Sequence, residues 1–408
     1  MLKLGIAGLG TVGIGVIKGI IANNKELTNR TGKDIVVTAV SARSNKDRGV
    51  DLSAYKWFDC AVEMAKSDDI AVFVELIGGS TGTALESVKE ALNNGKVVIT
   101  ANKAMLAEHG EELASIAENN NTTIYYEAAI AGGIPVVKTL REGMAGNKVH
   151  SIYGILNGTC NYIYTTIKET GRDFEDVLKE AQDLGYAEAE PSMDVDGIDA
   201  AQKLALMASI AFGTKGAFSQ MHIETIRYSI DNVDVTIVEK LGYSAKLVGL
   251  AQNTDAGIRL HMAPALVSLK GAFGNVNGVL NGVVLNGDMV GALTLVGVGA
   301  GRGASASAVL SDIADVASGG MKPVFNQSVA TLQSKPVLPM ATRCGKYYIR
   351  TDLEQSAFKS MLDNNNIAYS HIVTEQNSSV VITDDVQENT IRDIVKDNVQ
   401  SILRIEEC

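Results

Sequence analysis

Short apolar runs alternate with amphipathic stretches along the first part of the chain. The runs predict β-strands at residues 3–7, 35–40, 70–75, 97–100 and 123–127. The stretches between them have the apolar spacing of helices, at residues 14–22, 84–92 and 104–119. Strands that alternate with helices build a parallel sheet with helices on both faces. The sequence therefore predicts a doubly wound α/β domain at the start of the chain.

The pattern changes from about residue 132. Apolar periodicity predicts helices at residues 135–143, 161–170, 174–184 and 198–212. β-type runs follow from 246 to 298, with Asn-Gly pairs at 277–278, 281–282 and 286–287. Asn-Gly tolerates the positive φ angles of tight hairpin turns, so we predict an antiparallel meander here. We expect this sheet to take part in dimerisation.

The last part of the chain follows a polar stretch at 326–340, which holds two prolines and which we interpret as a linker. Residues 344–408 then show the order strand, helix, strand, strand, helix, strand. This order predicts a small third domain. A chain of 408 residues is too long for one hydrophobic core, which fits such a division.

Composition narrows the classes of function. The net charge of −11 argues against nucleic acid as a partner, because phosphates repel an acidic surface. No apolar run reaches the roughly 18 residues that a membrane span needs, and the first residues do not resemble a signal peptide. Four cysteines lie far apart without metal-ligand spacing, as reduced thiols do in a cytosol. We therefore expect a cytoplasmic protein with small-molecule ligands.

The first predicted strand runs directly into a glycine-rich turn and a helix. The turn is GLGTVG, a G-x-G-x-x-G pattern made of Gly8, Gly10, Thr11, Val12 and Gly13 around Leu9. The first glycine permits the tight turn, the second lets the backbone approach a pyrophosphate, and the third allows close helix–strand packing. The helix N-terminus adds free N–H groups and a positive dipole. We predict a dinucleotide site here; the alternative is a tight strand–helix turn without a ligand.

The end of the second strand bears on the choice of nucleotide. An NAD site usually carries an acidic residue there, which binds the ribose 2′-hydroxyl. Here the corresponding residues are neutral, and Arg43, Lys46 and Arg48 follow. A cation such as Arg43 suits a 2′-phosphate, so we predict a preference for NADP(H), with NAD(H) as the second possibility. The alternative is a solvated loop that is basic for no specific reason.

Two lysines are candidates for chemistry. The helix at 198–212 is apolar on nearly every side, yet it carries Lys203, with Asp199 one turn earlier and Asp196 at a neighbouring position. A lysine in a buried helix must be paired, or it loses its charge by desolvation, and both states suit proton transfer at a substrate oxygen. Lys103 follows the fourth predicted strand, on the side of the sheet where ligands bind. The alternatives are a surface ion pair and an ordinary helix-start lysine.

Seven segments, in this order, resemble the homoserine dehydrogenase family. They are GLGTVG at 8–13, VELIGG at 74–79, ITANKAMLA at 99–107, EAAIAGGIPVV at 127–137, LNGTCNYI at 156–163, LGYAEAEPSMDVDGIDAAQK at 184–203 and GVGAGRGASASAVLSD at 297–312. The resemblance spans residues 1 to about 320. It implies an NAD(P)H-dependent oxidoreductase that reversibly reduces L-aspartate 4-semialdehyde to L-homoserine, in threonine and methionine biosynthesis.

The resemblance also implies roles for single residues. Lys203 resembles the family's catalytic lysine, which donates a proton to the aldehyde oxygen as hydride arrives. Asp199 and Glu188 match the carboxylates that bind the substrate's amine and hydroxyl, and Asp194 falls in the same acidic loop. Lys103 matches a lysine that lies between substrate and nicotinamide.

A further part of the resemblance concerns the cofactor and a cation. Gly301 fits a late glycine that returns to the nucleotide site. Glu127, with backbone carbonyls of Ile130, Gly132 and Ile134, matches a site for Na⁺ or another monovalent cation. A carboxylate with carbonyls suits a hard ion of this kind.

The C-terminal segment resembles the ACT regulatory domain that often accompanies this family. Residues 351–356, TDLEQS, stand where ACT domains usually have an Asp-x-Pro-Gly turn, so it stays open whether the segment binds threonine or serves assembly alone. The predicted division is nucleotide binding at 1–131 and about 300–325, catalysis and dimerisation at 132–299, a linker at 326–340, and an ACT-like domain at 341–408. We expect a homodimer or homotetramer.

Two rival functions are weighed against this interpretation. Aspartate-semialdehyde dehydrogenase uses a cysteine nucleophile, a role that Cys160 superficially invites, but Cys160 has no candidate base nearby in the sequence. A catalytically silent sensor of NADP(H) and an amino acid is the second rival. The joint presence of both lysines and their carboxylates argues against a silent sensor, and oxidation of homoserine distinguishes the two.

Overall fold

The computed structural model describes residues 1–227 and 229–408, and the chain divides into two compact units. The first unit consists of Met1–Val149, Ala205–Phe218 and Gly297–Lys335. The second consists of His150–Leu204, Ser219–Val296 and Pro336–Cys408. Each unit is assembled from three separate stretches of the sequence, and each is described below by itself.

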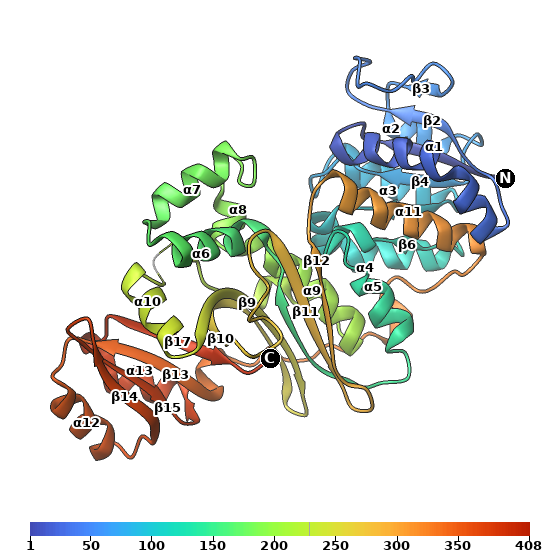
Figure 1. Ribbon diagram of the computed structural model, residues 1–408. Helices are drawn as coiled ribbons and strands as arrows, with labels where there is room; N and C mark the ends of the chain where they lie inside the picture. Colours follow the sequence, from blue (N-terminus) through green and yellow to red (C-terminus); the bar gives the residue numbers. More distant parts are fainter. Residues whose placement is uncertain (228) are drawn as a thin grey trace. The chain divides into compact units, whose positions relative to one another are not determined.

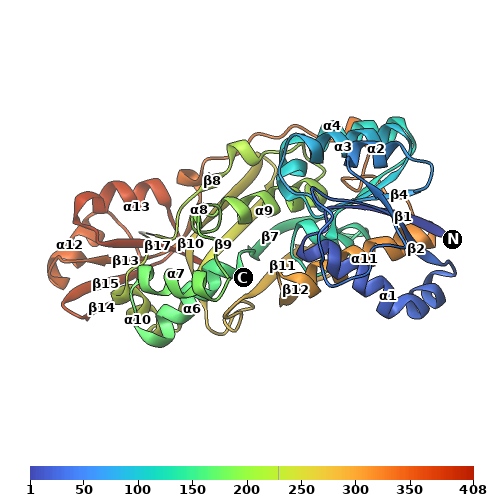
Figure 2. The same cartoon turned by 90° about the horizontal axis from the view of Figure 1, so that it is seen from above.

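The first unit is built on a six-stranded parallel sheet in the order β3-β2-β1-β4-β5-β6. The strands are β1 (Leu2–Ala7), β2 (Ile35–Ser41), β3 (Lys56–Phe58), β4 (Val72–Glu75), β5 (Val97–Thr100) and β6 (Ile124–Tyr125). Helices α1 (Thr11–Thr31) and α11 (Arg302–Ser318) pack together on one face, and α2 (Ala61–Lys66), α3 (Thr83–Asn93) and α4 (Lys103–Asn119) cover the other (Figure 2). This order is that of a doubly wound dinucleotide-binding fold, and it confirms the predicted class of the first domain.

The elements of this unit differ from the prediction in three places. β3 and α2 escape the prediction because they have only 3 and 6 residues, too few to show a period. The fifth predicted strand is shorter than expected, because the chain turns into a 3-10 helix at Glu127–Ala129. Glu127 therefore lies outside the sheet. The segment predicted as a helix at 135–143 forms α5 (Val136–Lys138) followed by a π-helical turn at Thr139–Gly143.

The second unit carries an eleven-stranded mixed sheet with the main order β12-β11-β7-β9-β10-β17-β13-β15-β14. Its strands are β7 (Val149–Ile155), β8 (His222–Ile223), β9 (Tyr243–Thr254), β10 (Gly257–Ser268), β11 (Leu280–Gly287), β12 (Gly291–Val298), β13 (Cys344–Thr351), β14 (Tyr369–Glu375), β15 (Ser378–Thr383), β16 (Val386–Gln387) and β17 (Ser401–Glu406). The helices are α6 (Gly158–Thr170), α7 (Phe174–Asp183), α8 (Ser192–Val195), α10 (Asn232–Lys240), α12 (Gln355–Asn364), α13 (Glu388–Val395) and the first half of α9 (Ile198–Phe212), whose residues from Ala205 on belong to the first unit. The predicted helices at 161–170, 174–184 and 198–212 are confirmed as α6, α7 and α9.

The prediction that all three Asn-Gly pairs form hairpin turns is wrong. Gly278 has the positive φ of a turn residue, at 61°, but the pairs at 281–282 and 286–287 lie inside β11. Gly282 serves packing instead, since a Cβ there would lie 3.1 Å from the ring of Phe273. β9 and β10 do form the predicted antiparallel pair, joined by a turn at residues 255–256.

The C-terminal segment shows the predicted order of strands and helices (Figure 1), to which the structure adds the short β16. Its strands lie in the order β17-β13-β15-β14 and enclose a core around Tyr347, Phe358 and Val381. β17 pairs in parallel with β10, so the sheet of this segment continues the sheet of the preceding residues. The stretch 326–340 is anchored by bridges of Gln333 to Thr214 and of Val337 to Ile258.

Candidate active site

The glycine-rich turn in the first unit has the geometry of a phosphate-binding loop. Gly8 has a φ of 101°, and a Cβ there would lie 2.2 Å from the carbonyl oxygen of Leu76. A Cβ on Gly13 would lie 2.0 Å from the carbonyl oxygen of Gly8. Gly10, by contrast, faces open space, and α1 begins directly after it. Two glycines are thus required by packing, and the middle one leaves the helix N-terminus open to an anion.

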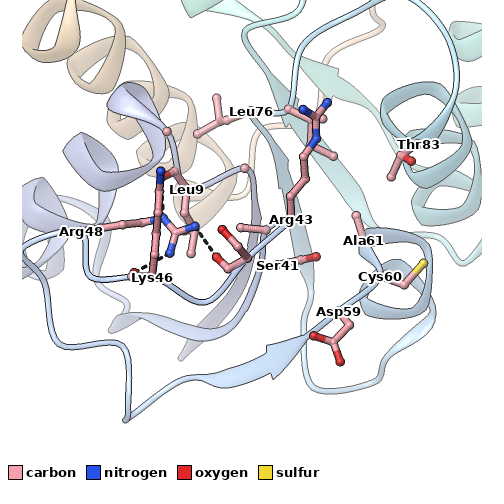
Figure 3. Close-up of a pocket in the computed structure, with 15 residues that line it drawn as sticks. Leu9, Ser41, Arg43, Lys46, Arg48, Asp59, Cys60, Ala61, Leu76 and Thr83 are labelled. Atoms are coloured by element: carbon pink, nitrogen blue, oxygen red, sulfur yellow. Dashed lines mark hydrogen bonds between the residues drawn. The ribbon is translucent and has the colours of Figure 1, made fainter.

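A cavity of about 600 Å³ adjoins this turn. Figure 3 shows Arg43, Lys46 and Arg48 among its lining residues. The guanidinium of Arg48 donates to the carbonyl oxygens of Leu9 (3.1 Å) and Lys46 (2.8 Å), so it is committed to holding the loop. Within the described residues, Arg43 makes no hydrogen bond or ion pair with the protein. The predicted cationic residues therefore surround one cavity, and exposed Arg43 and Lys46 are open to a ligand there, whereas Arg48 holds the loop.

A smaller cavity of about 130 Å³ lies at the ends of β4 and β5. Buried Glu75 shapes it: its carboxylate accepts from the N–H groups of Ile77 (2.7 Å) and Gly78 (3.0 Å) and from the hydroxyl of Thr100. Asn102 caps α4, and Lys103 is its first residue. This arrangement puts Lys103 at the carboxyl end of a parallel strand, as the sequence predicts.

Lys203 and Asp199 form the centre of the second unit's polar cluster. Lys203 Nζ donates to Asp199 Oδ2 at 2.7 Å and to the carbonyl oxygen of Leu156 at 2.8 Å. The side chains of Lys203 and Asp199 are only 11% and 14% exposed. The alternative of a solvated surface ion pair is therefore wrong.

Asn157 connects this pair to Asp194. Its Oδ1 accepts from the N–H of Cys160 and so caps α6, while its Nδ2 donates to Asp194 Oδ1 at 2.7 Å and to Asp199 Oδ2 at 3.2 Å. Burial raises the pKa of the Asp194 carboxyl; the hydrogen bond from Asn157 opposes this, and the charge of Asp199 adds to it. Sequence reasoning missed Asn157 as a site residue, although an asparagine between a strand and a helix signals a cap.

Three other predicted residues have different surroundings. Glu188 is exposed, and its carboxylate makes no hydrogen bond or ion pair within the described residues, so it stays open to a ligand. Asp196 accepts from the hydroxyl of Thr225 at 2.9 Å. Cys160 is fully buried, which raises the pKa of its thiol well above the ordinary value. A thiol in that state is a poor nucleophile, and this argues against the cysteine mechanism.

The predicted cation segment lies in the first unit. The carboxylate of Glu127 accepts from the N–H groups of Val137 (2.8 Å) and Lys138 (2.9 Å), at the start of α5. Burial raises the pKa of Glu127, and these two N–H groups oppose the shift. Gly132 has a φ of 55°. Each carboxylate oxygen accepts one of these N–H groups and keeps a further lone pair, so the carboxylate and main-chain carbonyls together fit a hard cation. Among the described residues, no group of three or more His, Cys, Asp or Glu side chains converges as a metal site.

Gly301, predicted to return to the nucleotide site, directly precedes α11. Its φ is 104°, and a Cβ there would meet nothing within 4 Å. The helix that it begins packs against α1, with Arg302 and Ala306 close to Gly15.

A doubly wound domain with a glycine-rich phosphate loop, together with a buried lysine–carboxylate cluster, defines a nicotinamide-dependent oxidoreductase. Family models described as "Homoserine dehydrogenase, NAD binding domain" and "Homoserine dehydrogenase" match residues 8–127 and 135–314. The chain belongs to the homoserine dehydrogenase family, whose members are NAD(P)-dependent oxidoreductases that act on a CH–OH group.

Individual relatives agree with this assignment. A homoserine dehydrogenase of Neisseria gonorrhoeae is 41% identical over 85% of this chain and 81% of its own length. The crystal structure of a homoserine dehydrogenase from Thiobacillus denitrificans has a TM-score of 0.92 at 34% identity, covering 100% of this chain and 98% of that one. A hyperthermophilic archaeal homoserine dehydrogenase in complex with NADPH has a TM-score of 0.66 at 26% identity, over 77% of this chain and 97% of that one. In the described part of the chain, no helix combines the length and apolar character needed to cross a membrane.

Proposed function

We propose that this chain reduces L-aspartate 4-semialdehyde to L-homoserine with Lys203 as the proton donor. The surroundings of the ammonium group carry the proposal. Asp199 balances its charge and the carbonyl oxygen of Leu156 takes a second N–H, which leaves the third N–H of the group for a substrate oxygen. A charged donor held in a largely buried position is suited to stabilise an alkoxide as it forms.

The roles in the reduction follow from this arrangement. When bound, the dihydronicotinamide supplies the hydride to the aldehyde carbon. Lys203 donates a hydrogen bond to the aldehyde oxygen and transfers a proton to that oxygen as negative charge develops on it. In the direction of homoserine oxidation, neutral Lys203 takes the hydroxyl proton. Lys103 is assigned the position between substrate and nicotinamide that the family resemblance implies.

Carboxylates are proposed to hold the substrate's ammonium group. Asp194 is oriented by Asn157, which fixes one of its oxygens and leaves its other oxygen beside Thr159, at a long 3.4 Å. Glu188 is exposed on the same acidic loop and open to contact with a ligand. Asp199, which the family resemblance also assigns to substrate binding, accepts from the same Asn157 amide at 3.2 Å. An analogue without the ammonium group should therefore bind weakly.

NADP(H) is the proposed preferred cofactor, with NAD(H) as the second. The support is the cavity beside Gly8 and Gly10, where β2 ends at Ser41 without an acidic residue and Arg43 is open to a phosphate. Asp59 also lines the cavity, but its carboxylate accepts from the indole N–H of Trp57 at 2.8 Å. The cofactor seen with the archaeal relative is NADPH, in agreement with this proposal.

A monovalent cation, such as Na⁺, is proposed to bind the segment from Glu127 to Ile134. The proposed donors are the carboxylate of Glu127 and the backbone carbonyl oxygens of Ile130, Gly132 and Ile134. The carboxylate of Glu127 also holds the segment against α5. A cation bound in this way stabilises the turn and takes no direct part in proton transfer.

We further propose an ACT-like C-terminal domain and a homo-oligomer, either a dimer or a tetramer. The tail's strand order, β17-β13-β15-β14, with two helices, supports the ACT-like architecture. For the oligomer, the support is β12, an edge strand that exposes Val296 and Val298, next to exposed Met289 and Val290. Apolar side chains on an open strand edge favour pairing with a second copy of the chain.

Initial rates at 340 nm test the proposed reaction and cofactor. L-homoserine is supplied with NADP⁺ or with NAD⁺, each with and without L-threonine. We expect homoserine-dependent reduction of both cofactors, with the larger kcat/KM for NADP⁺. Binding of either cofactor without any reduction would contradict the proposal and favour a silent sensor. Inhibition by L-threonine would give the C-terminal domain a regulatory role. Without such inhibition, assembly would be its remaining proposed role.

A further inference from the structure

A series of buried polar contacts leads from β17 to the loop that carries Asp194. Arg404 on β17 is almost fully buried, and its guanidinium binds two glutamates. Nε and Nη2 donate to the two carboxylate oxygens of Glu388, at 2.8 and 2.6 Å, and Nη2 also donates to Glu224 Oε1 at 2.9 Å. Glu388 begins α13 in the C-terminal segment, whereas Glu224 directly follows β8. One arginine of the last strand thus holds the beginning of the segment 224–226.

Glu224 is fixed by further contacts. Its N–H donates to the carbonyl oxygen of Met262 on β10 at 2.9 Å, and its carboxylate lies 2.7 Å from His222 Nε2. Burial by itself would raise the pKa of Glu224, but His222 and Arg404 outweigh burial and lower this pKa to about 2. Glu224 is therefore ionised near neutral pH, and its contact with Arg404 is a permanent charge pair.

The next residue, Thr225, reaches the acidic loop. Its hydroxyl lies 2.9 Å from Asp196 Oδ1 and 3.1 Å from the carbonyl oxygen of Val195. The N–H of Ile226 donates to the same carbonyl oxygen at 2.9 Å. Val195 and Asp196 are the two residues that follow Asp194, so these contacts hold the loop directly after the carboxylate that is proposed to bind the substrate.

We propose that Thr225 is a positioning residue for substrate binding and that Arg404 acts through Glu224 to keep it in place. The inference rests on the proposed role of Asp194. If a loop becomes ordered only when the substrate binds, the free energy of ordering it weakens the binding. A loop that is already held in place therefore gives a higher substrate affinity. The C-terminal segment then contributes to substrate affinity without touching the substrate.

A role in stability alone and a role in positioning predict different changes in kinetics and in melting temperature. Replacing a buried ion pair by apolar side chains is often neutral for stability, so ion pairs of this kind are poorly explained by stability alone. A positioning role predicts a change in KM for the amino-acid substrate, with kcat and the KM for the cofactor left nearly unchanged. The two roles are therefore separated by kinetics, with the melting temperature measured alongside.

The test compares Thr225→Val, which removes the hydroxyl, with Thr225→Ser, which keeps it. We expect Thr225→Val to raise the KM for L-homoserine roughly tenfold, with kcat changed by less than about threefold, and Thr225→Ser to restore the original KM. Thr236→Val is the matched control, because the hydroxyl of Thr236 is exposed on α10 and donates to the carbonyl oxygen of Asn232. Unchanged KM in Thr225→Val, at an unchanged melting temperature, would overturn the inference.

A double variant shows whether the hydroxyl acts through Asp194. Adding Thr225→Val to Asp194→Asn should not raise the KM for L-homoserine further, whereas an additive rise would overturn the inference. If Asp194→Asn alone leaves the KM unchanged, the proposed substrate-binding role of Asp194 fails. If Asp194→Asn raises the KM and Thr225→Val does not, only the positioning inference fails. Glu224→Gln should raise the KM in the same direction; an unchanged KM would overturn the part that includes Arg404.

Discussion

Lys203 Nζ lies 2.7 Å from Asp199 Oδ2, one helical turn earlier on α9. On an exposed helix such a pair contributes little, because water screens both charges. Here both side chains are largely buried, and the lysine also donates to the carbonyl oxygen of Leu156. The pair therefore fixes the direction of the ammonium group more than it stabilises the helix. This is the property that a proton donor to a substrate oxygen requires.

Asn157 is expected to matter for catalysis through its amide nitrogen, which orients Asp194 and Asp199. Asn157→Asp keeps a good helix cap but replaces the Nδ2 donor by a negative charge beside Asp194 and Asp199. We expect kcat/KM for L-homoserine to fall roughly 100-fold. The melting temperature should fall too at neutral pH, because Asn157 is buried and a third carboxylate at this position repels the other two. Asn157→Ala should lower kcat/KM and also remove about 1 kcal/mol of stability with the lost cap. Full activity in Asn157→Asp would show that the amide does not orient the carboxylates.

Arg43 is expected to distinguish the two cofactors. Arg43→Ala should raise the KM for NADP⁺ roughly tenfold and leave that for NAD⁺ nearly unchanged, because only NADP⁺ carries the 2′-phosphate. Arg48→Ala serves as the comparison, since Arg48 holds the carbonyl oxygens of Leu9 and Lys46 and should affect both cofactors. An equal effect of Arg43→Ala on the KM for both cofactors would show that Arg43 does not bind the 2′-phosphate.

The raised pKa of Asp194 predicts how substrate binding depends on pH. Burial, the main cause of the shift, makes this carboxyl take up a proton at a higher pH than an ordinary aspartate does. The protonated group no longer attracts an ammonium, so the KM for L-homoserine should rise as pH falls through the raised pKa. Asp194→Asn should abolish this limb of the pH profile. A limb that persists in the variant would belong to another group.

The same shift has a consequence for stability. Because the folded-state pKa lies above the unfolded-state value, the folded chain binds this proton more tightly than the unfolded chain does. The stability that this proton contributes is fully present below the unfolded pKa and is lost as pH rises through the folded pKa. As pH rises through this interval, the unchanged chain loses this stability and Asp194→Asn does not. The melting temperature of the variant should therefore rise relative to that of the unchanged chain. A difference that is independent of pH would contradict the shift.

Much of the fold follows from short-range patterns. The GLGTVG turn, the strand ends beside it and the nearly all-apolar helix α9 each carry a local signal strong enough to predict the element. The C-terminal order of strands and helices is likewise visible as alternating periodicity. β3 and α2 are too short to show a period, and Glu127 leaves its strand because of contacts with α5 and α11 that no local pattern records.

The site divides in the same way. Lys203 and Asp199 are one turn apart on one helix, so their contact is predictable from spacing. Asn157 meets Asp194 only through the packing of α6 against the acidic loop, 37 residues later in the sequence. For the Asn-Gly pairs of β11 the local pattern predicts a feature that does not form. The pattern is typical of turns, but both pairs lie in a strand, where Gly282 makes room for the ring of Phe273.

Cys160 is expected to be dispensable for the chemistry. Its thiol is fully buried with a pKa raised well above the ordinary value, and its Sγ donates to the carbonyl oxygen of Asp194 at 3.2 Å. Cys160→Ala should keep kcat within about threefold, since a thiol–carbonyl hydrogen bond is weak. In the unchanged chain, exposed Cys60 and Cys344 should react with iodoacetamide while Cys160 does not. Loss of turnover in Cys160→Ala would bring back a cysteine mechanism.

The role of Lys203 is tested most directly by homoserine-dependent reduction of NADP⁺ in Lys203→Met, with NADPH binding measured on the same preparation. Met keeps most of the side-chain volume and removes the proton donor. We predict that kcat falls by about three orders of magnitude, as the loss of a general acid–base group does, while the Kd for NADPH stays unchanged. Turnover within a few-fold of the original value would show that Lys203 does not transfer the proton.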